Sequence, residues 1–212
     1  ELATDVTRGE PVCRNVVGLL RGCDPDLAKE CVIIGAHYDH LGLGDVGAMG
    51  GAPGEIYFGA DDNASGTTAV IEAARAFGSC PIRPKRSVVF VCFTGEEVGL
   101  FGSNHYAKNP LIPLADTAAM INLDMVGRVR EDRLTVMGAG SGEGFEDMLR
   151  RANEGLALKL SLPKQGYPGS DHTPFYTRKV PALFLCSGVH PDYHKPSDTW
   201  DKINFDGLAR VV

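Results

Sequence analysis

Ser87–Phe93 (SVVFVCF) restricts the possible folds more than any other segment of this chain. It has no charged side chain, and most of its residues are β-branched or aromatic. Such an uninterrupted run is typical of a strand buried on both faces of a sheet, since a half-exposed strand alternates apolar with polar residues. Cys31–Ala36 (CVIIGA) and Ala182–Cys186 (ALFLC) have the same character. A sheet covered on both faces needs helices on each side, so these runs predict an α/β fold.

Helical periodicity between the apolar runs supports this fold class. Ser65–Gly78 places Thr67, Val70, Ile71, Ala74 and Phe77 on one helical face. We further expect strands at Arg14–Leu20, Ala118–Leu123 and Leu134–Met137, and helices at Gly99–Lys108, Gly142–Leu156 and Asn204–Val212. The turn residues of Arg21–Glu30 predict that Arg14–Leu20 and Cys31–Ala36 are neighbouring strands. Strands that alternate with helices favour an α/β sandwich around a largely parallel sheet.

Length, charge and cysteine spacing exclude several classes of protein. A chain of 212 residues suits one domain and is short for two. Its formal net charge of −6, without a basic run, argues against binding to nucleic acid or an anionic membrane surface. No apolar stretch approaches the roughly 20 residues of a membrane span, and the start lacks the layout of a signal peptide. The six cysteines include no CxxC pair, which argues against a zinc ribbon or a thioredoxin-like site.

Ionisable side chains follow the predicted strands at the points where those strands end. They are His37, Asp39 and His40, then Asp61 and Asp62 in GADDNASG, Glu96 and Glu97 in TGEEVG, Asp124 in INLDM, and His190, Asp192, His194 and Asp198 in VHPDYHKPSDT. Sites in open parallel sheets lie at the carboxyl ends of the strands. We therefore expect five strand ends to bring these side chains to one edge of the sheet.

This combination of side chains predicts a metal site. Carboxylates crowded at one edge raise each other's pKa unless a cation neutralises them. Mixed imidazole and carboxylate ligands suit Zn²⁺ or a related first-row ion, and more than four of them indicate two metals that share a carboxylate. Adjacent Glu96 and Glu97 point different ways from a regular strand, so one can bind a metal while the other acts as a general base. The pattern favours a two-metal hydrolase.

Several further motifs in the chain give weaker signals. Each acidic cluster alone has an ordinary structural explanation as a helix cap or a first-turn charge, and only their recurrence favours a site. Gly42–Gly47 matches GxGxxG but is followed by more loop instead of a helix. Gly138–Gly144 lacks the Lys-Ser/Thr of a phosphate-binding loop, and neither GxSxG nor HExxH occurs.

Six motifs together resemble one known family. GAHYDHLG, GADDNASG, FTGEEVGLFGS, INLDM, GSDHTPF and YHKPSDT occur in the order and approximate spacing of the dizinc aminopeptidases of peptidase family M28. The resemblance covers roughly residues 13–205. It implies a three-layer α/β/α sandwich with a mixed, largely parallel sheet. It also implies that residues 1–212 form a single catalytic domain, truncated at one or both ends.

The resemblance implies a role for each matching residue. His37 and Asp124 would hold one zinc ion, Glu97 and His194 the other, and Asp62 would bridge the two, with a cis peptide to Asn63. Glu96 would be the general base, and Asp39 would accept a hydrogen bond from the His37 ring. Tyr193 would stabilise the oxyanion, and Ser170, Asp171 and His172 would line the substrate pocket.

The implied activity is removal of the N-terminal residue from peptides, with two Zn²⁺ per chain and a free substrate amino group. Many members of the family are exported, so we expect a secreted or periplasmic protein; its oligomeric state is left open. A carboxypeptidase or dipeptidase on the same scaffold would need a partner for a substrate carboxylate, and Arg128 and Arg130 are the available residues. A one-zinc glutaminyl-peptide cyclase, a non-catalytic binding domain of the same fold and a metal-storage role are further hypotheses that the sequence leaves open.

Overall fold

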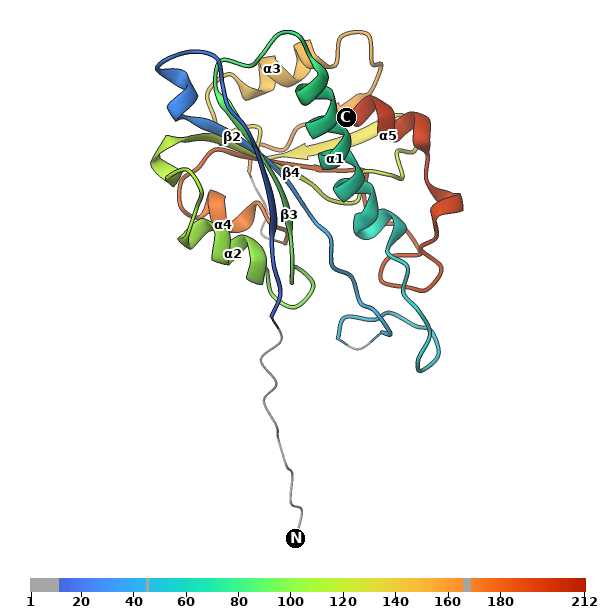
Figure 1. Cartoon of the computed structure of the whole chain (residues 1–212). Helices are drawn as coiled ribbons and strands as arrows, with labels where there is room; N and C mark the ends of the chain where they lie inside the picture. The colour runs from blue at the N-terminus through green and yellow to red at the C-terminus, as the bar shows by residue number, and fades with distance from the viewer. Residues whose placement is uncertain (1–11, 45, 166–168) are drawn as a thin grey trace.

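The computed structural model describes residues 12–44, 46–165 and 169–212 (Figure 1). Within these ranges, seven strands form one sheet in the order β1-β3-β2-β4-β7-β5-β6. The strands are β1 (Val16–Leu20), β2 (Cys31–His37), β3 (Ser87–Phe93), β4 (Thr117–Leu123), β5 (Arg133–Met137), β6 (Lys159–Ser161) and β7 (Ala182–Cys186). The pairs β1–β3 and β5–β7 are antiparallel, and the other pairs are parallel. The sheet is therefore mixed and largely parallel, as predicted.

Helices cover both faces of this sheet. They are α1 (Gly66–Ser79), α2 (Phe101–Lys108), α3 (Phe145–Ala152), α4 (Thr173–Tyr176) and α5 (Phe205–Val211), with the short turns η1 (Leu27–Lys29), η2 (Ala60–Ser65), η3 (Leu114–Asp116) and η4 (Trp200–Lys202). Figure 1 shows α1, α3 and α5 on one side of the sheet and α2 and α4 on the other. The predicted three-layer arrangement is confirmed. None of the helices in the described ranges has the length and apolar character needed to cross a membrane.

The described residues form three hydrophobic clusters, and β2 contributes to two of them, one on each face of the sheet. Ile33 is fully buried in the core that contains Phe175 of α4, whereas Ile34 packs in the core that contains Val70 of α1 and Leu208 of α5. Successive residues of a strand point to opposite faces, so a strand with a core on each side must be apolar throughout. This explains the uninterrupted apolar runs.

The expected pairing of the first two strands is wrong. β1 does not pair with β2; it pairs with β3, with Val16 opposite Cys92 and Leu20 opposite Val88. β2 and β3 are almost entirely buried, whereas β1 is mostly exposed. The buried strands need a neighbour on each edge, and β1 lies at the outer edge, where Val16, Val17 and Leu19 stay exposed.

Two short elements, β6 and α4, were not expected from the sequence. β6 has three residues and α4 has four, too few to show a hydrophobic periodicity. The predicted helix at Gly142–Leu156 is shorter and spans Phe145–Ala152, because Gly144 precedes it in the left-handed conformation, with φ 76°.

The carboxyl ends of β2, β3, β4 and β7 meet at one edge of the sheet, because these strands are parallel to one another. The expectation of five strand ends needs one correction. Asp61 and Asp62 belong to η2, the irregular turn that leads into α1, and not to the end of a strand. Asp62 therefore reaches the edge from the turn before α1, while the other acidic and imidazole groups lie at the ends of strands or in the segments that follow them.

We expect Ile33→Ala to lower the free energy of unfolding by about 2–5 kcal/mol, because Ile33 is fully buried and its truncation leaves a cavity. Val16→Ala is the matched control, since Val16 is 62% exposed on the edge strand; we expect a change of about 0.5 kcal/mol or less. Urea denaturation of both variants measures the difference. Equal losses would contradict the assignment of the core.

Candidate metal centre

The predicted ligand residues come together at the carboxyl edge of the sheet. His37 is the last residue of β2, Asp124 follows β4, Glu97 follows β3 and His194 lies in the segment after β7. His37, Asp62 and Asp124 are all buried, with exposed fractions of 1%, 3% and 8%. Residues from distant parts of the sequence thus form one polar cluster between the layers.

Asp62 lies at the centre of the cluster, between two imidazole rings. Its Oδ1 is 3.3 Å from Nε2 of His37, and its Oδ2 is 3.1 Å from Nε2 of His194. The peptide bond between Asp62 and Asn63 is cis, which confirms that prediction. Each carboxylate oxygen faces a different imidazole, which is the geometry that a carboxylate needs to bridge two cations.

A second carboxylate accompanies each imidazole. Nε2 of His37 is 3.5 Å from Oδ1 of Asp124, and Nε2 of His194 is 3.2 Å from Oε2 of Glu97. The side chains therefore form two groups, His37 with Asp124 and His194 with Glu97, that share Asp62. The same grouping is what the resemblance to family M28 implies, and that these groups bind metal stays a prediction.

The orientation of both rings suits metal ligation. Nδ1 of His37 donates to the carbonyl oxygen of Asp39 at 3.1 Å, and Nδ1 of His194 donates to that of Gly47 at 2.8 Å. A metal-ligating histidine usually donates its other ring nitrogen in this way, which fixes the tautomer. In both rings Nε2, the nitrogen that faces the carboxylates, is then the one that a metal could take as its ligand.

A buried oxygen of Asp124 gives an independent test of the fit to a metal. Oδ1 of Asp124 is inaccessible to solvent and has no hydrogen-bond partner in the described part of the chain. Buried polar atoms are normally satisfied, so this oxygen needs a partner that the protein does not supply. His37, Asp62 and Asp124 each offer one atom that could ligate a metal, and these three atoms lie within 4.8 Å of one another. These residues fit a divalent cation.

The electrostatics of the cluster agree with this interpretation. Burial lowers the pKa of the His37 imidazole, but Asp124, Asp62 and Glu96 outweigh it and hold that pKa well above its ordinary value. Burial raises the pKa of Glu96 to about 9; His37 opposes this shift, and nearby carboxylates add to it. The cluster therefore has an excess of negative charge, which a bound cation would neutralise.

Asp39 supports the site differently from what the sequence suggested. Its carboxylate is 3.7 Å from Nδ1 of His37, and the backbone carbonyl of Asp39 accepts the ring hydrogen bond instead. The carboxylate accepts hydrogen bonds from the backbone N–H groups of Glu96 and Glu97, at 3.1 and 3.2 Å. Asp39 thus links the end of β2 to the loop that carries the two glutamates.

Ser170, Asp171 and His172 do not line the cavity, which corrects the prediction that they do. They are at most 1% exposed, and none of them is among the residues that line it. The hydroxyl of Ser170 accepts from Asn122 and donates to Oδ2 of Asp124, both at 2.7 Å. Burial raises the pKa of Asp171 to about 7. These three residues directly precede α4, and Ser170 supports the site through its hydrogen bond to Asp124.

The cavity itself has a volume of about 250 Å³ and joins the polar cluster to an apolar wall. Its polar side consists of Asp62, Glu96, Glu97, Asp124, Tyr193 and His194, and its apolar side includes Met125, Met137, Phe184, Cys186 and Val189. The Tyr193 ring stacks on the His194 ring, with centroids 3.9 Å apart. Glu96 and Tyr193, to which the sequence assigned catalytic roles, therefore face the same space as the candidate ligands.

Two supporting residues had no assigned role at the sequence level. Nδ1 of His40 donates to Oε1 of Glu97 at 2.7 Å, and Oδ2 of Asp198 accepts from the backbone N–H groups of Asp61 and Asp62 at 2.9 and 3.1 Å. Both occur among the ionisable residues at the sheet edge. Their residue types identified them as candidates, but only the folded chain shows which ligand each one contacts.

Arg128 and Arg130 are both occupied by contacts within the protein. Arg128 is buried and donates to Asp192 at 2.9 Å and to Asp198 at 2.6 Å. Arg130 donates to the carbonyl oxygen of Val189 at 3.0 Å. The Arg128 guanidinium is therefore engaged by two carboxylates, whereas Arg130 is exposed, and neither arginine is among the residues that line the cavity with the candidate ligands. This argues against a carboxypeptidase.

Taken together, the three-layer fold and the position of Asp62 between two imidazole rings define an α/β protein with a candidate metal-binding site at the carboxyl edge of its sheet. The chain belongs to peptidase family M28, whose sequence profile matches residues 15–212.

Known relatives are longer than this chain. Aminopeptidase YwaD of Bacillus subtilis is 30% identical over an alignment that covers 93% of this chain and 42% of the relative. A probable leucine aminopeptidase of Trichophyton verrucosum is also 30% identical, over an alignment that covers 89% of this chain and 52% of the relative. The structure of BSAP, a zinc aminopeptidase from Bacillus subtilis, matches with a TM-score of 0.75 and 28% identity over 93% of this chain and 47% of that one. The chain thus spans about half the length of these relatives.

A glutaminyl cyclase from Porphyromonas gingivalis shares the fold, with a TM-score of 0.74 and 20% identity over 93% of this chain and 73% of that one. At this identity the similarity concerns the fold alone. It shows that the same sandwich supports more than one kind of site, so the function must be argued from the residues of this chain.

We expect Asp198→Asn to lower the free energy of unfolding by about 3 kcal/mol, because it leaves the buried Arg128 without one of its two charged partners. Asp201→Asn is the matched control, since Asp201 is exposed on the neighbouring turn. Thermal and chemical denaturation of both variants test the expectation. A loss no larger than that of the control would contradict a supporting role for Asp198.

Proposed function

We propose that this protein is a zinc-dependent aminopeptidase that uses two Zn²⁺ per chain. The observation that carries the proposal is the position of Asp62 between His37 and His194, in a cavity that also contains Glu96. Aminopeptidase and zinc aminopeptidase are the names of relatives that match over about nine-tenths of this chain.

His37 and Asp124 would hold one zinc ion, Glu97 and His194 the other, and Asp62 would bind both. When bound, zinc ions polarise a carbonyl group and lower the pKa of water towards neutrality. Imidazole and carboxylate are ordinary ligands of zinc. The hydrogen bonds from His40 to Glu97 and from Ser170 to Asp124 keep the carboxylates in ligating positions.

Glu96 would act as the general base. Both glutamates line the cavity, but the carboxylate of Glu97 is held by His194 and His40. Glu96 would take the proton of the attacking water and transfer it to the nitrogen of the departing amine. The hydroxyl of Tyr193 would donate a hydrogen bond to the oxygen of the former carbonyl group, with its ring held against His194.

The cavity indicates the class of substrate. Its carboxylates attract the positively charged amino group at the start of a peptide, and its apolar wall suits an apolar first side chain. A volume of about 250 Å³ is enough for the first side chain of a peptide. We therefore propose peptides with a free, apolar N-terminal residue as substrates. A secreted or periplasmic location stays a prediction.

A panel of free and N-acetylated aminoacyl amides tests the proposal. We expect the zinc-loaded protein to cleave the free amides, leucyl and methionyl amides best, and to leave the acetylated ones intact. Treatment with a chelator should abolish cleavage, and metal analysis should give close to two zinc ions per chain. Cleavage of the acetylated amides would exclude an aminopeptidase, and one zinc ion or none would overturn the two-metal site.

We expect Glu96→Gln to lower kcat by about 10³-fold while the zinc content stays at two, because the amide cannot accept the proton of water. Glu143→Gln, on the exposed segment before α3, is the matched control and should leave kcat unchanged. Steady-state kinetics and metal analysis measure both effects. Near-normal turnover in Glu96→Gln would show that another group is the base.

A further inference from the structure

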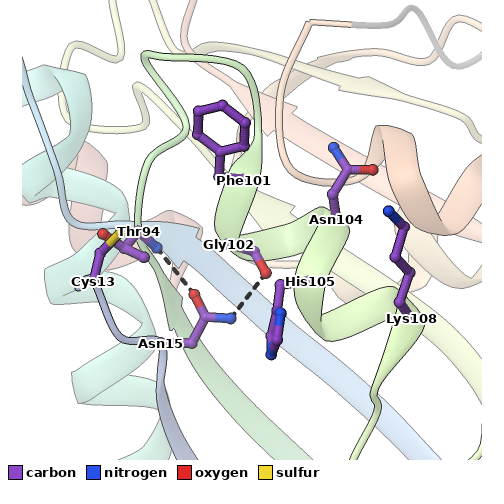
Figure 2. Close-up of a pocket in the computed structure, with 8 residues that line it drawn as sticks. All are labelled: Cys13, Asn15, Thr94, Phe101, Gly102, Asn104, His105 and Lys108. Carbon is purple, nitrogen blue, oxygen red and sulfur yellow. Dashed lines mark hydrogen bonds between the residues drawn. The ribbon is translucent and has the colours of Figure 1, made fainter. Parts of the chain in front are cut away.

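The loop that carries Glu96 and Glu97 is closed at its base by a side chain from the edge of the sheet. Asn15 directly precedes β1, and its Nδ2 donates to the carbonyl oxygen of Gly102 at 2.8 Å. Its Oδ1 accepts from the backbone N–H of Thr94 at 3.1 Å. Figure 2 shows the amide of Asn15 between these two backbone groups. Asn15 thus contacts both ends of the segment from Thr94 to Gly102.

This segment is a compact unit, so its base determines where its tip lies. The backbone N–H groups of Gly102, Phe101 and Leu100 donate in turn to the carbonyl oxygens of Thr94, Gly95 and Glu96, at 2.8, 2.9 and 3.0 Å. These nested hydrogen bonds extend from the base of the loop to Glu96. At the tip, the carboxylate of Asp39 holds the N–H groups of Glu96 and Glu97.

The side chain of Asn15 binds the backbone just beyond the end of the hydrogen-bonded ladder between β1 and β3. The last residue pair of that ladder is Val16 with Cys92, and the chain of β3 then continues through Phe93 to Thr94. The backbone carbonyl of Arg14 is held separately, because it accepts from the hydroxyl of Tyr38 at 2.7 Å. The backbone on either side of Asn15 is therefore held by other contacts. The side-chain amide of Asn15 is not needed there and serves to hold the loop.

Gly102 leaves the space that this contact needs. A Cβ atom at Gly102 would overlap Oδ1 of Asn15 and the carbonyl oxygen of Thr94. The φ angle of Gly102 is not positive, so close approach and not backbone conformation accounts for glycine here. The contact between Asn15 and Gly102 can therefore be tested by substituting either residue.

From these contacts we infer that Asn15 is a positioning residue for the Glu96–Glu97 pair: it fixes the base of the loop and so sets where Glu97 binds its metal and where Glu96 meets the water. The inference rests on the proposed function. It predicts an asymmetric effect, since Glu97 is part of this loop, whereas His37 and Asp124 come from other strands and His37 is joined to the loop only indirectly, through Asp39.

We expect Asn15→Ala to weaken one of the two zinc sites by about 10–100-fold and to leave the other within about threefold, as is usual when a group that orients a ligand is removed. kcat should fall by about tenfold or more with little change in KM. Titration of the chelator-treated protein with Zn²⁺ against a chromophoric chelator gives both dissociation constants. Gly102→Ala should have the same effect. If Asn15→Ala does not fold, Asn15→Asp replaces it in the titration, because the aspartate keeps the hydrogen-bond acceptor and loses the donor.

Asn153→Ala is the matched control. Asn153 also spans two backbone groups, donating to the carbonyl of Leu158 at 2.7 Å and accepting from its N–H at 3.1 Å, but it lies at the end of α3. It should lose comparable stability with both zinc sites and kcat unchanged. In a Glu97→Ala background, which removes one site, Asn15→Ala should leave the remaining zinc constant unchanged, because the coupling runs through Glu97.

The outcomes separate this inference from the proposed function. Fewer than two zinc sites in the unmodified protein would overturn the proposed function, and the inference with it. Two sites that Asn15→Ala and Gly102→Ala weaken equally, or leave unchanged, would overturn the inference alone. An effect of Asn153→Ala equal to that of Asn15→Ala would also overturn it, since the loss would then reflect stability only.

Discussion

The carboxylate of Asp62 lies between two imidazole rings, and much of the surrounding structure holds it there. Asp198 binds the backbone N–H groups before and at Asp62, and Arg128 binds Asp198. On the other side, Nδ2 of Asn63 donates to the carbonyl of Leu123, and its Oδ1 accepts from Gly66 and Met125. The turn is thereby attached to the end of β4 and the start of α1. A carboxylate that is to be shared by two cations must be held rigidly, because a small displacement favours one of them over the other.

The sheet supplies the opposing side of the cluster. Four parallel strands end together, and the two cores beneath them keep those ends fixed relative to one another. Each strand then places one or two polar side chains at the edge, where backbone N–H and C=O groups no longer belong to the ladder and are available for hydrogen bonds. Asp39 and Asn15 use such groups to hold the loop of Glu96 and Glu97. Rigid packing and local hydrogen bonds thus act together to organise the ligands before any cation binds.

Much of this arrangement could be predicted from local patterns, and the failures have definite causes. The strands at Ser87–Phe93 and Ala182–Cys186 agree residue for residue with β3 and β7, because burial on both faces leaves a strong signal. The pairing of β1 with β3 could not be read from a turn, since the order of strands depends on which strands need two neighbours. Ser170 was assigned to the substrate pocket from its motif, yet it binds Asp124 from below. A motif identifies which residues belong to a site but not the side from which they approach it.

The sequence by itself determined the α/β class, the edge of the sheet where the polar groups gather and the residue types that favour a cation there. These follow from periodicity and from the chemistry of imidazole and carboxylate, which are local properties. The tertiary structure decided that Asp62 comes from a turn, that the carbonyl of Asp39 orients His37 and that Asn15 closes the glutamate loop. These contacts join residues whose distance in space depends on the packing of the layers, and no local pattern encodes that distance.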